Sequence, residues 1–226
     1  MTRLARAVKE HGAPLLGIAA YFYDPIFVEI VAKLGFRILW IEMEHAFITF
    51  AQAADLCRIA SGAGMLTMIR IPDGRRENVL KACECGADIV DLPMVETPEI
   101  AHEFIQYARF RPEGARGYFS VPRALDYGMV ESLPQAQQKL NSELCLMIQI
   151  ETEQAVQRAD ELCAIPGLDI RHFCDAVTAT STPHASSSNG IPPIDETPST
   201  IVSTPRAVAT CATAATSFAT PVDESE

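Results

Sequence analysis

The sequence is short of positive charge and contains no long hydrophobic run. Its 226 residues carry 18 Lys and Arg against 29 Asp and Glu, which gives a formal net charge of −11. Binding to nucleic acid requires a clustered positive face, so this balance argues against such a partner. No apolar run approaches the roughly 20 residues that span a bilayer, and the first residues lack the apolar core of a secretory signal. We therefore expect a cytoplasmic protein that binds neither nucleic acid nor a membrane.

The seven cysteines are scattered and include no C-x-x-C motif. Cys83 and Cys85 form C-x-C, a spacing that does not match the paired motifs of a zinc site. We interpret the cysteines mostly as small buried residues in a reducing compartment. They do not indicate a disulfide framework.

Short apolar runs alternate with helical patterns at intervals of roughly 25 residues, which is typical of βα units and a parallel sheet. Asp24, Thr49 and Thr97 are placed to begin helices as N-caps. A fifth strand is due before Tyr127, where the sequence is irregular. The expected strands are 15–20, 38–45, 65–71, 89–95 and 144–151.

Ionisable residues stand where three of these strands end. Glu44 and His45 end the second strand, Arg70 closes the third, and Glu151 closes the last. The carboxyl ends of parallel strands meet at one face, so these groups can together bind a metal and a carboxylate. Each also has a plainer explanation: a polar loop after the second strand, an ion pair between Arg70 and a loop acid, and a solvated helix start at Glu151. Their recurrence at strand ends favours a site.

Five ordered blocks stand out at the expected strand ends and in the loop after residue 110: Ile41-Glu42-Met43-Glu44-His45, Ile69-Arg70-Ile71-Pro72, Leu92-Pro93-Met94-Val95, Arg111-Pro112-Glu113-Gly114-Ala115-Arg116-Gly117-Tyr118 and Gln149-Ile150-Glu151-Thr152. Together they resemble the HpcH/HpaI-type class II aldolases, which act on pyruvate and related 2-oxo acids. The resemblance covers roughly residues 15–170. It implies an α/β fold, the (β/α)₈ TIM barrel of the phosphoenolpyruvate/pyruvate type. It also implies cleavage of a 4-hydroxy-2-oxo acid to pyruvate and an aldehyde through a metal-stabilised enolate.

The resemblance also implies roles for five residues. Glu151 would be a metal ligand, and Gln149 would lie beside the metal and the substrate. Arg70 would bind the carboxylate or enolate oxygen of the 2-oxo acid, and His45 would be the base. Glu42 stands where the family usually has an aspartate paired with that histidine. The cofactor would be a divalent cation that prefers oxygen ligands, Mg²⁺ or Mn²⁺, with Co²⁺ as another possibility.

The resemblance stops near Ile170. The family continues with a seventh strand, Gly-Pro-x-Asp with a second metal ligand, and two further βα units. Here residues 171–226 are rich in Ala, Thr, Ser and Pro, so we expect a disordered tail and a barrel that is incomplete after its sixth strand. We assign neither His172 nor Asp175 as the missing ligand, because no Gly-Pro precedes them. The family forms homo-oligomers partly through C-terminal helices, which this tail does not predict.

Three functions remain open from the sequence. The first is the metal-dependent carbon–carbon lyase that the resemblance implies. The second is a degenerate fragment that keeps His45, Arg70 and Glu151 but does not turn over a substrate. The third is a decarboxylase or a carbon–carbon-forming synthase that uses a pyruvate enolate on the same scaffold.

Overall fold

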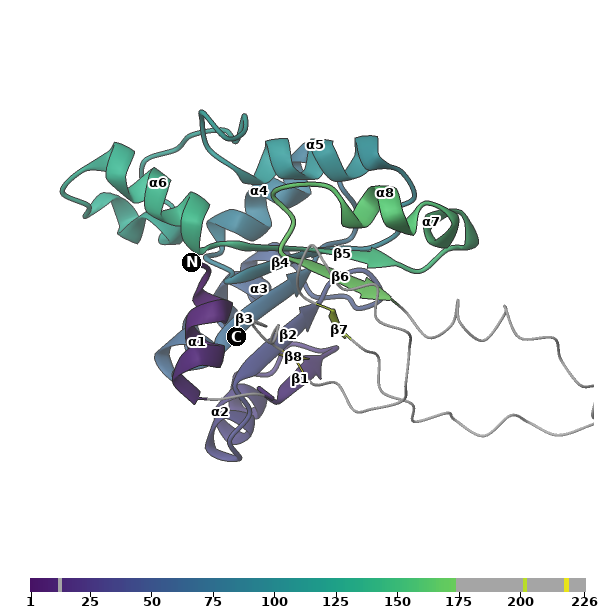
Figure 1. The fold of residues 1–226 in the computed structure, drawn as a ribbon. Helices are drawn as coiled ribbons and strands as arrows, with labels where there is room; N and C mark the ends of the chain where they lie inside the picture. Colours follow the sequence, from purple (N-terminus) through teal and green to yellow (C-terminus); the bar gives the residue numbers. More distant parts are fainter. Residues whose placement is uncertain (12–13, 174–200, 203–217, 220–226) are drawn as a thin grey trace, which may run out of the picture.

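The computed structural model describes residues 1–11, 14–173, 201–202 and 218–219. Within these residues six parallel strands form a curled half-barrel, with each strand beside its neighbour in the sequence (Figure 1). The predicted incomplete barrel is therefore confirmed. Two short strands, β7 and β8, extend the sheet beyond β6, where β7 pairs antiparallel. The strands are β1 (Gly17–Ala20), β2 (Ile38–Glu42), β3 (Leu66–Arg70), β4 (Ile89–Leu92), β5 (Cys145–Ile150), β6 (Ile170–Phe173), β7 (Ile201–Val202) and β8 (Phe218–Ala219).

The helices begin where the sequence places caps. Asp24 accepts the N–H of Ile26 at 2.8 Å at the start of α2, and Thr49 forms a capping box at α3. None of the helices in the described part of the chain is long and apolar enough to cross a membrane. The helices are α1 (Arg3–His11), α2 (Pro25–Lys33), α3 (Phe50–Gly62), α4 (Arg76–Glu84), α5 (Pro98–Ala108), α6 (Leu133–Glu143), α7 (Glu153–Gln157) and α8 (Ala159–Cys163), with a 3₁₀ helix, η1, at Arg123–Gly128.

The expected fifth strand does not form. The segment between α5 and α6 is a loop that ends in η1, and β4 pairs directly with β5. Pro112 and Pro122 cannot donate to a sheet ladder, and Gly114 and Gly117 weaken a strand further. The irregular sequence therefore gives an irregular connection, and the sixth parallel strand is β6, at the point where the resemblance stops.

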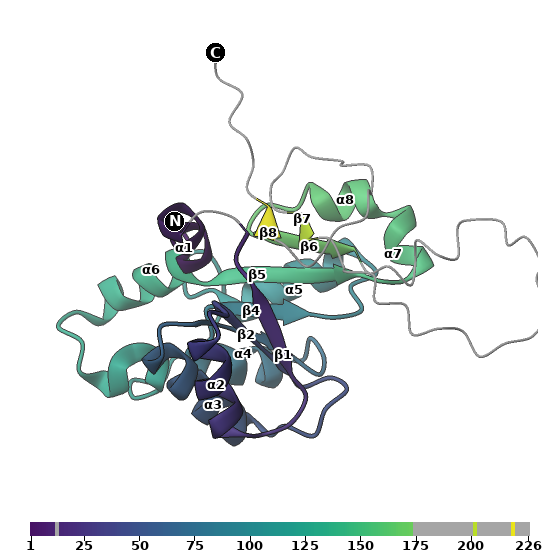
Figure 2. The same ribbon diagram turned by 90° about the horizontal axis from the view of Figure 1, so that it is seen from below.

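Two apolar layers hold the sheet. The larger one lies between the strands and the outer helices, and the smaller one lines the inner curve. In the smaller layer Leu4 and Val8 of α1 pack against Ile38, Met68 and Ile89, so α1 closes the N-terminal end of the half-barrel (Figures 1 and 2). Toward the carboxyl ends of the strands the same inner face becomes polar, which positions the site described below.

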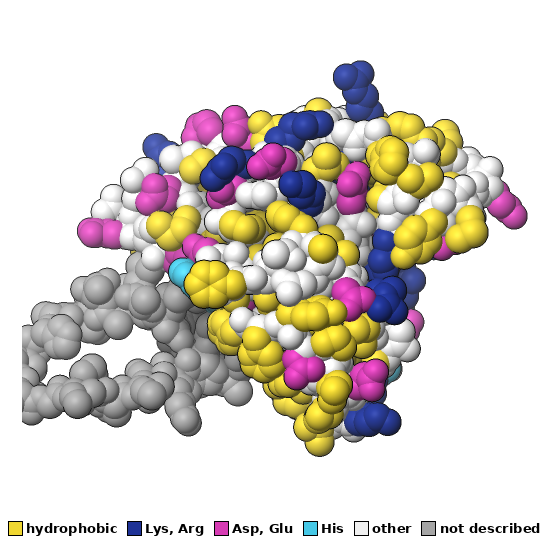
Figure 3. Space-filling model, turned by 180° about the vertical axis from the view of Figure 1, so that it is seen from behind, with side chains coloured by type: hydrophobic (Ala, Val, Ile, Leu, Met, Phe, Trp, Pro, Cys, Tyr) yellow, Lys and Arg dark blue, Asp and Glu magenta, His cyan; other side chains and the backbone are white. Residues whose placement is uncertain are grey.

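One side of the half-barrel keeps an exposed apolar surface. Ile26, Ile30 and Leu34 of α2 and its C-cap follow a helical spacing, and each is more than half exposed. Figure 3 shows hydrophobic side chains gathered on the face of the molecule that includes α2. Apolar surface of this kind favours association between molecules.

Candidate active site

Arg70 is the centre of a cluster of acids at the carboxyl ends of the strands. Its Nη1 lies 3.4 Å from Glu42 Oε2, and its Nη2 lies 2.5 Å from Glu44 Oε2 and 3.2 Å from Glu151 Oε2. The register of β2 and β3 places Glu42 directly opposite Arg70. Burial acts to lower the pKa of Arg70, but the surrounding carboxylates outweigh it and raise that pKa. The structure thus brings together three groups that the sequence places at separate strand ends, Glu42, Arg70 and Glu151.

Glu42 and His45 meet through the main chain. Glu42 Oε1 accepts the backbone N–H of Glu44 at 2.8 Å and that of His45 at 3.1 Å. The imidazole of His45 is 67% exposed, and its Nε2 lies 3.4 Å from Glu44 Oε2. Glu42 therefore shapes the turn after β2, while Glu44 is the acid beside the imidazole. Burial is the main cause that raises the pKa of Glu44, and the neighbouring carboxylates add to it.

Glu151 joins two strand ends. Its Oε2 faces Arg70, and its Oε1 accepts the backbone N–H of Met94 at 2.7 Å. Met94 follows β4 with a φ of 56°, a left-handed conformation that is uncommon outside glycine and that marks functional sites. This turn and Arg70 together fix the carboxylate of Glu151.

Gln149 lies deeper and is held by an acid that sequence reasoning missed. Its Nε2 donates to Oδ2 of Asp91, which is fully buried in β4. Burial raises the pKa of Asp91 to about 8, so its carboxyl is mostly neutral at neutral pH. Asp91 stands inside an apolar run, so its composition gave no warning. The sequence could have indicated it only through the alternation of side chains along the strand, which turns Asp91 to the same face as the residues at the strand ends. The register confirms that shared face, because Asp91 pairs with Arg70.

His172 lies on β6 directly opposite Gln149 in the sheet. It is buried, and neither ring nitrogen has a hydrogen-bond partner within the described residues. Burial, aided by the positive charge of Arg70, lowers the pKa of His172 to about 4, so the ring is neutral at neutral pH. Asp175, the other residue near the expected second metal ligand, lies outside the described residues.

The donor set suits a hard divalent cation in its chemistry. Glu42, Glu44 and Glu151 offer carboxylate oxygens around a single arginine, and Glu44 Oε2 forms ion pairs with Arg70 and His45. Of these side chains, Glu151 is the one expected to hold the cation. Among the residues whose structure is described, no three His, Cys, Asp or Glu side chains are grouped so as to hold a metal ion. Any cation here would therefore need ligands besides this cluster, such as water or the substrate.

Comparison with known proteins gives a consistent set of relatives. The sequence model described as HpcH/HpaI aldolase/citrate lyase matches residues 22–215, which run past the boundary expected at residue 170. A hydroxypyruvate/pyruvate aldolase from Roseovarius nubinhibens is 28% identical over 169 residues, which are 74% of this chain and 65% of that protein. A 2-keto-3-deoxy-L-rhamnonate aldolase from Klebsiella pneumoniae is 32% identical over 142 residues, 62% of this chain and 52% of that protein.

A solved structure agrees in fold. The HpcH/HpaI aldolase from Desulfitobacterium hafniense superposes with a TM-score of 0.70 at 27% identity, over 77% of this chain and 67% of that one. The chain spans between about half and two thirds of the length of the two aldolases named above.

Proposed function

Because the chain belongs to the HpcH/HpaI aldolase/citrate lyase family, we propose that it is a metal-dependent aldolase. The reaction is the cleavage of a 4-hydroxy-2-oxo acid to pyruvate and an aldehyde. The observation that carries the proposal is the convergence of Glu42, Arg70 and Glu151 on one point at the strand ends. The names of the two aldolases above support the same reaction class.

Arg70 would bind the carboxylate of the substrate. Its Nη2 is shared by Glu44 and Glu151, and a substrate carboxylate must replace one of them. Glu44 is the more exposed of the two, with 17% against 12%, and burial already favours its neutral form. Glu44 is therefore the acid that gives way, and the fork of Arg70 then pairs with the 2-oxo acid.

His45 would carry the proton. As the C3–C4 bond breaks, a neutral imidazole accepts the proton of the C4 hydroxyl, and the bonding electrons pass to C3 and the C2 carbonyl as an enolate. Return of a proton to C3 then gives pyruvate. After leaving Arg70, Glu44, whose Oε2 lies 3.4 Å from Nε2, would accept a hydrogen bond from the imidazolium that forms in between. Glu151 would hold a divalent cation such as Mg²⁺ or Mn²⁺, and that cation would supply Lewis-acid stabilisation of the enolate.

Pyruvate release from 4-hydroxy-2-oxopentanoate tests the proposal. We expect release in the presence of Mg²⁺ or Mn²⁺ and its loss with EDTA. The variants Arg70→Lys, His45→Ala and Glu151→Gln should each lower the rate by at least about 100-fold. Arg37→Gln is the matched control, because Arg37 is exposed at the opposite end of the sheet.

Two results would reject the aldolase. A folded chain that binds the cation but releases no pyruvate from a panel of hydroxy-oxo acids would be the degenerate fragment. Pyruvate formed from oxaloacetate, with none from hydroxy-oxo acids, would indicate a decarboxylase on the same scaffold. Unchanged rates in the three variants would reject the roles assigned to Arg70, His45 and Glu151.

A further inference from the structure

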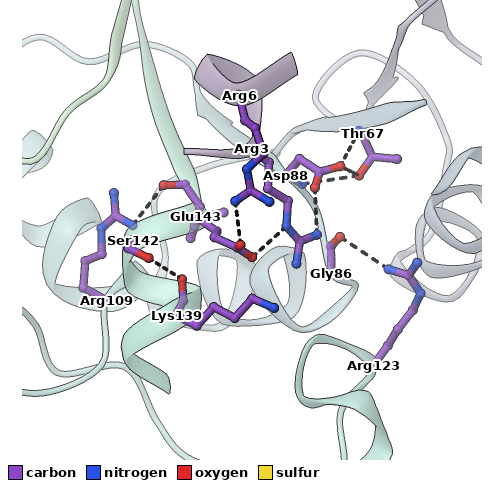
Figure 4. A network of polar contacts seen from close by, with 11 residues as sticks. Arg3, Arg6, Thr67, Gly86, Asp88, Arg109, Arg123, Lys139, Ser142 and Glu143 are labelled. Atoms are coloured by element: carbon purple, nitrogen blue, oxygen red, sulfur yellow. Dashed lines mark hydrogen bonds and ion pairs between the residues drawn. The ribbon is translucent and has the colours of Figure 1, made fainter. Parts of the chain in front are cut away.

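A cavity lies at the N-terminal end of the half-barrel, opposite the strand ends that hold the candidate active site. Its volume is about 220 Å³. It is lined by Arg3 of α1, by Asp88 just before β4, by Glu143 at the end of α6 and by the arginines Arg116 and Arg123. Figure 4 shows the polar network in the wall of this cavity.

The acids that Figure 4 shows in this wall have no oxygen left for a ligand. Asp88 Oδ1 accepts from Arg3 at 2.9 Å, and Oδ2 accepts from the backbone and hydroxyl of Thr67 at 2.8 and 3.1 Å. Glu143 accepts from Arg6 at 2.7 Å and from Arg3 at 3.0 Å. Burial favours the neutral form of Glu143, but these arginines outweigh it and lower its pKa. With all four oxygens engaged, the network does not favour a cation.

Arg123 binds the C-terminal end of α4, and these contacts fix its positive charge at the cavity wall. Its Nη1 donates to the carbonyls of Cys85 and Gly86, at 3.0 and 3.3 Å, where α4 ends. A cation at this position suits the negative end of a helix. Gly86 has a φ of 78°, and a Cβ on it would collide with Nη1 of Arg123. Glycine is therefore required for this close approach.

Arg116 has no comparable explanation. It is 7% exposed, and its guanidinium carbon stacks 4.4 Å from the ring centre of Phe110. Its Nε and Nη2 are buried and have no hydrogen-bond partner within the described structure. A ring face offsets only part of the hydration that a buried cation loses, so an unpaired guanidinium here is costly. An anion is the partner that would offset this cost.

We propose that this cavity is a binding site for a phosphate group, held mainly by Arg116. The fork of a guanidinium matches two oxygens of a phosphate, and Arg123 adds a second fixed positive charge at the wall. A dianion balances both charges, which a single carboxylate does not. Asp126 also lines the cavity but is exposed, so water screens its carboxylate. The site is separate from the candidate active site and does not depend on the proposed function.

Thermal melting of the full chain tests this proposal, with inorganic phosphate as the probe and chloride keeping the ionic strength constant. We expect Tm to rise with the logarithm of the phosphate concentration once phosphate exceeds its Kd, with a rise of about 3–5 °C at tenfold above the Kd. Arg116→Met should show no rise, and in phosphate-free buffer it should melt at or above the parent, because it lacks the buried charge. Arg37→Gln should respond as the parent does.

A conservative variant and a second anion complete the test. Arg116→Lys keeps the charge but not the fork, so its phosphate affinity should fall by about tenfold or more. Equal rises in the parent and in both Arg116 variants would overturn the site. A parent whose Tm does not rise with phosphate would overturn it too, and a rise with acetate equal to that with phosphate would overturn the choice of ligand.

Discussion

Replacement of Asp91 by asparagine should stabilise the protein, and increasingly so as the pH rises. Asp91 is fully buried beside Gln149, and burial raises the pKa of its carboxyl to about 8. In the unfolded chain the same carboxyl has its ordinary pKa of about 3.9. An acid with a raised folded pKa contributes stability that is complete below the unfolded pKa and is lost as the pH rises through the folded pKa.

The size of the effect follows from the two pKa values. From about pH 5 to about pH 8 the carboxyl of Asp91 is ionised in the unfolded chain but mostly protonated in the folded protein. Each pH unit in this window costs the parent about 1.4 kcal/mol, so the loss reaches roughly 4 kcal/mol. This is a large share of the roughly 5–15 kcal/mol that stabilises a typical domain. The uncharged amide of the variant would have no such loss, and its carbonyl can still accept from Gln149.

Urea unfolding of the parent and of Asp91→Asn, in EDTA at several pH values, measures this difference. Groups that titrate alike in both proteins cancel when one curve is subtracted from the other. The difference in unfolding free energy should grow by roughly 4 kcal/mol between about pH 5 and about pH 8. A difference that stays flat across this range would show that Asp91 is ionised and solvated in the folded protein, and would refute the reasoning.

Three further predictions concern other parts of the chain. Burial lowers the pKa of His172 to about 4 in the folded protein, so the stability that its neutral ring contributes is complete above about pH 6.5 and is lost as the pH falls toward 4. In urea unfolding, His172→Leu should remove a loss of about 2 kcal/mol between about pH 7 and about pH 5. Arg70→Met leaves its acids without a counter-charge and should cost about 3–5 kcal/mol at neutral pH, less in acid, with Mg²⁺ restoring part of it in calorimetry; equal Tm values in the parent and the variant would contradict this. Ile30→Lys with Leu34→Lys should reduce self-association in light scattering and leave the unfolding free energy within about 0.5 kcal/mol.

The arrangement of the strand ends could be predicted from the sequence. Once apolar runs alternate with helical patterns, parallel pairing follows, and parallel pairing sends every strand's carboxyl end to one face. Glu42, Arg70 and Glu151 meet for that reason. The plainer explanation of Arg70, an ion pair with a loop acid, is also realised, because Glu44 lies 2.5 Å from it. The two explanations describe one cluster.

The buried polar residues of the interior could not be predicted in the same way. Asp91 lies in an apolar run and His172 in a mixed one, and the place of each in the interior depends on register and burial. A sequence gives side-chain parity within a strand but not which strand lies opposite which. The absent fifth strand shows the same limit, since β4 pairs with β5 only when the intervening segment fails to pair with either. The contact of Glu42 with the backbone of His45 depends on a turn that periodicity does not describe.

Exposure within the candidate site implies how a substrate would lie in it. The Arg70 side chain is 11% exposed, whereas that of His45 is 67% exposed. The carboxylate of a 2-oxo acid would therefore bind at the enclosed end, where electrostatic pairing is strong, and the aldehyde end would face water near His45. On the proposed function, enlarging the aldehyde portion by one or two methylenes should change kcat/KM by less than about tenfold. Replacing the substrate carboxylate by an amide should lower kcat/KM by about 100-fold or more, because it leaves Arg70 without its charged partner. Steady-state kinetics on both substrate series decides the matter, and a stronger dependence on the aldehyde than on the carboxylate would place the substrate in the opposite orientation.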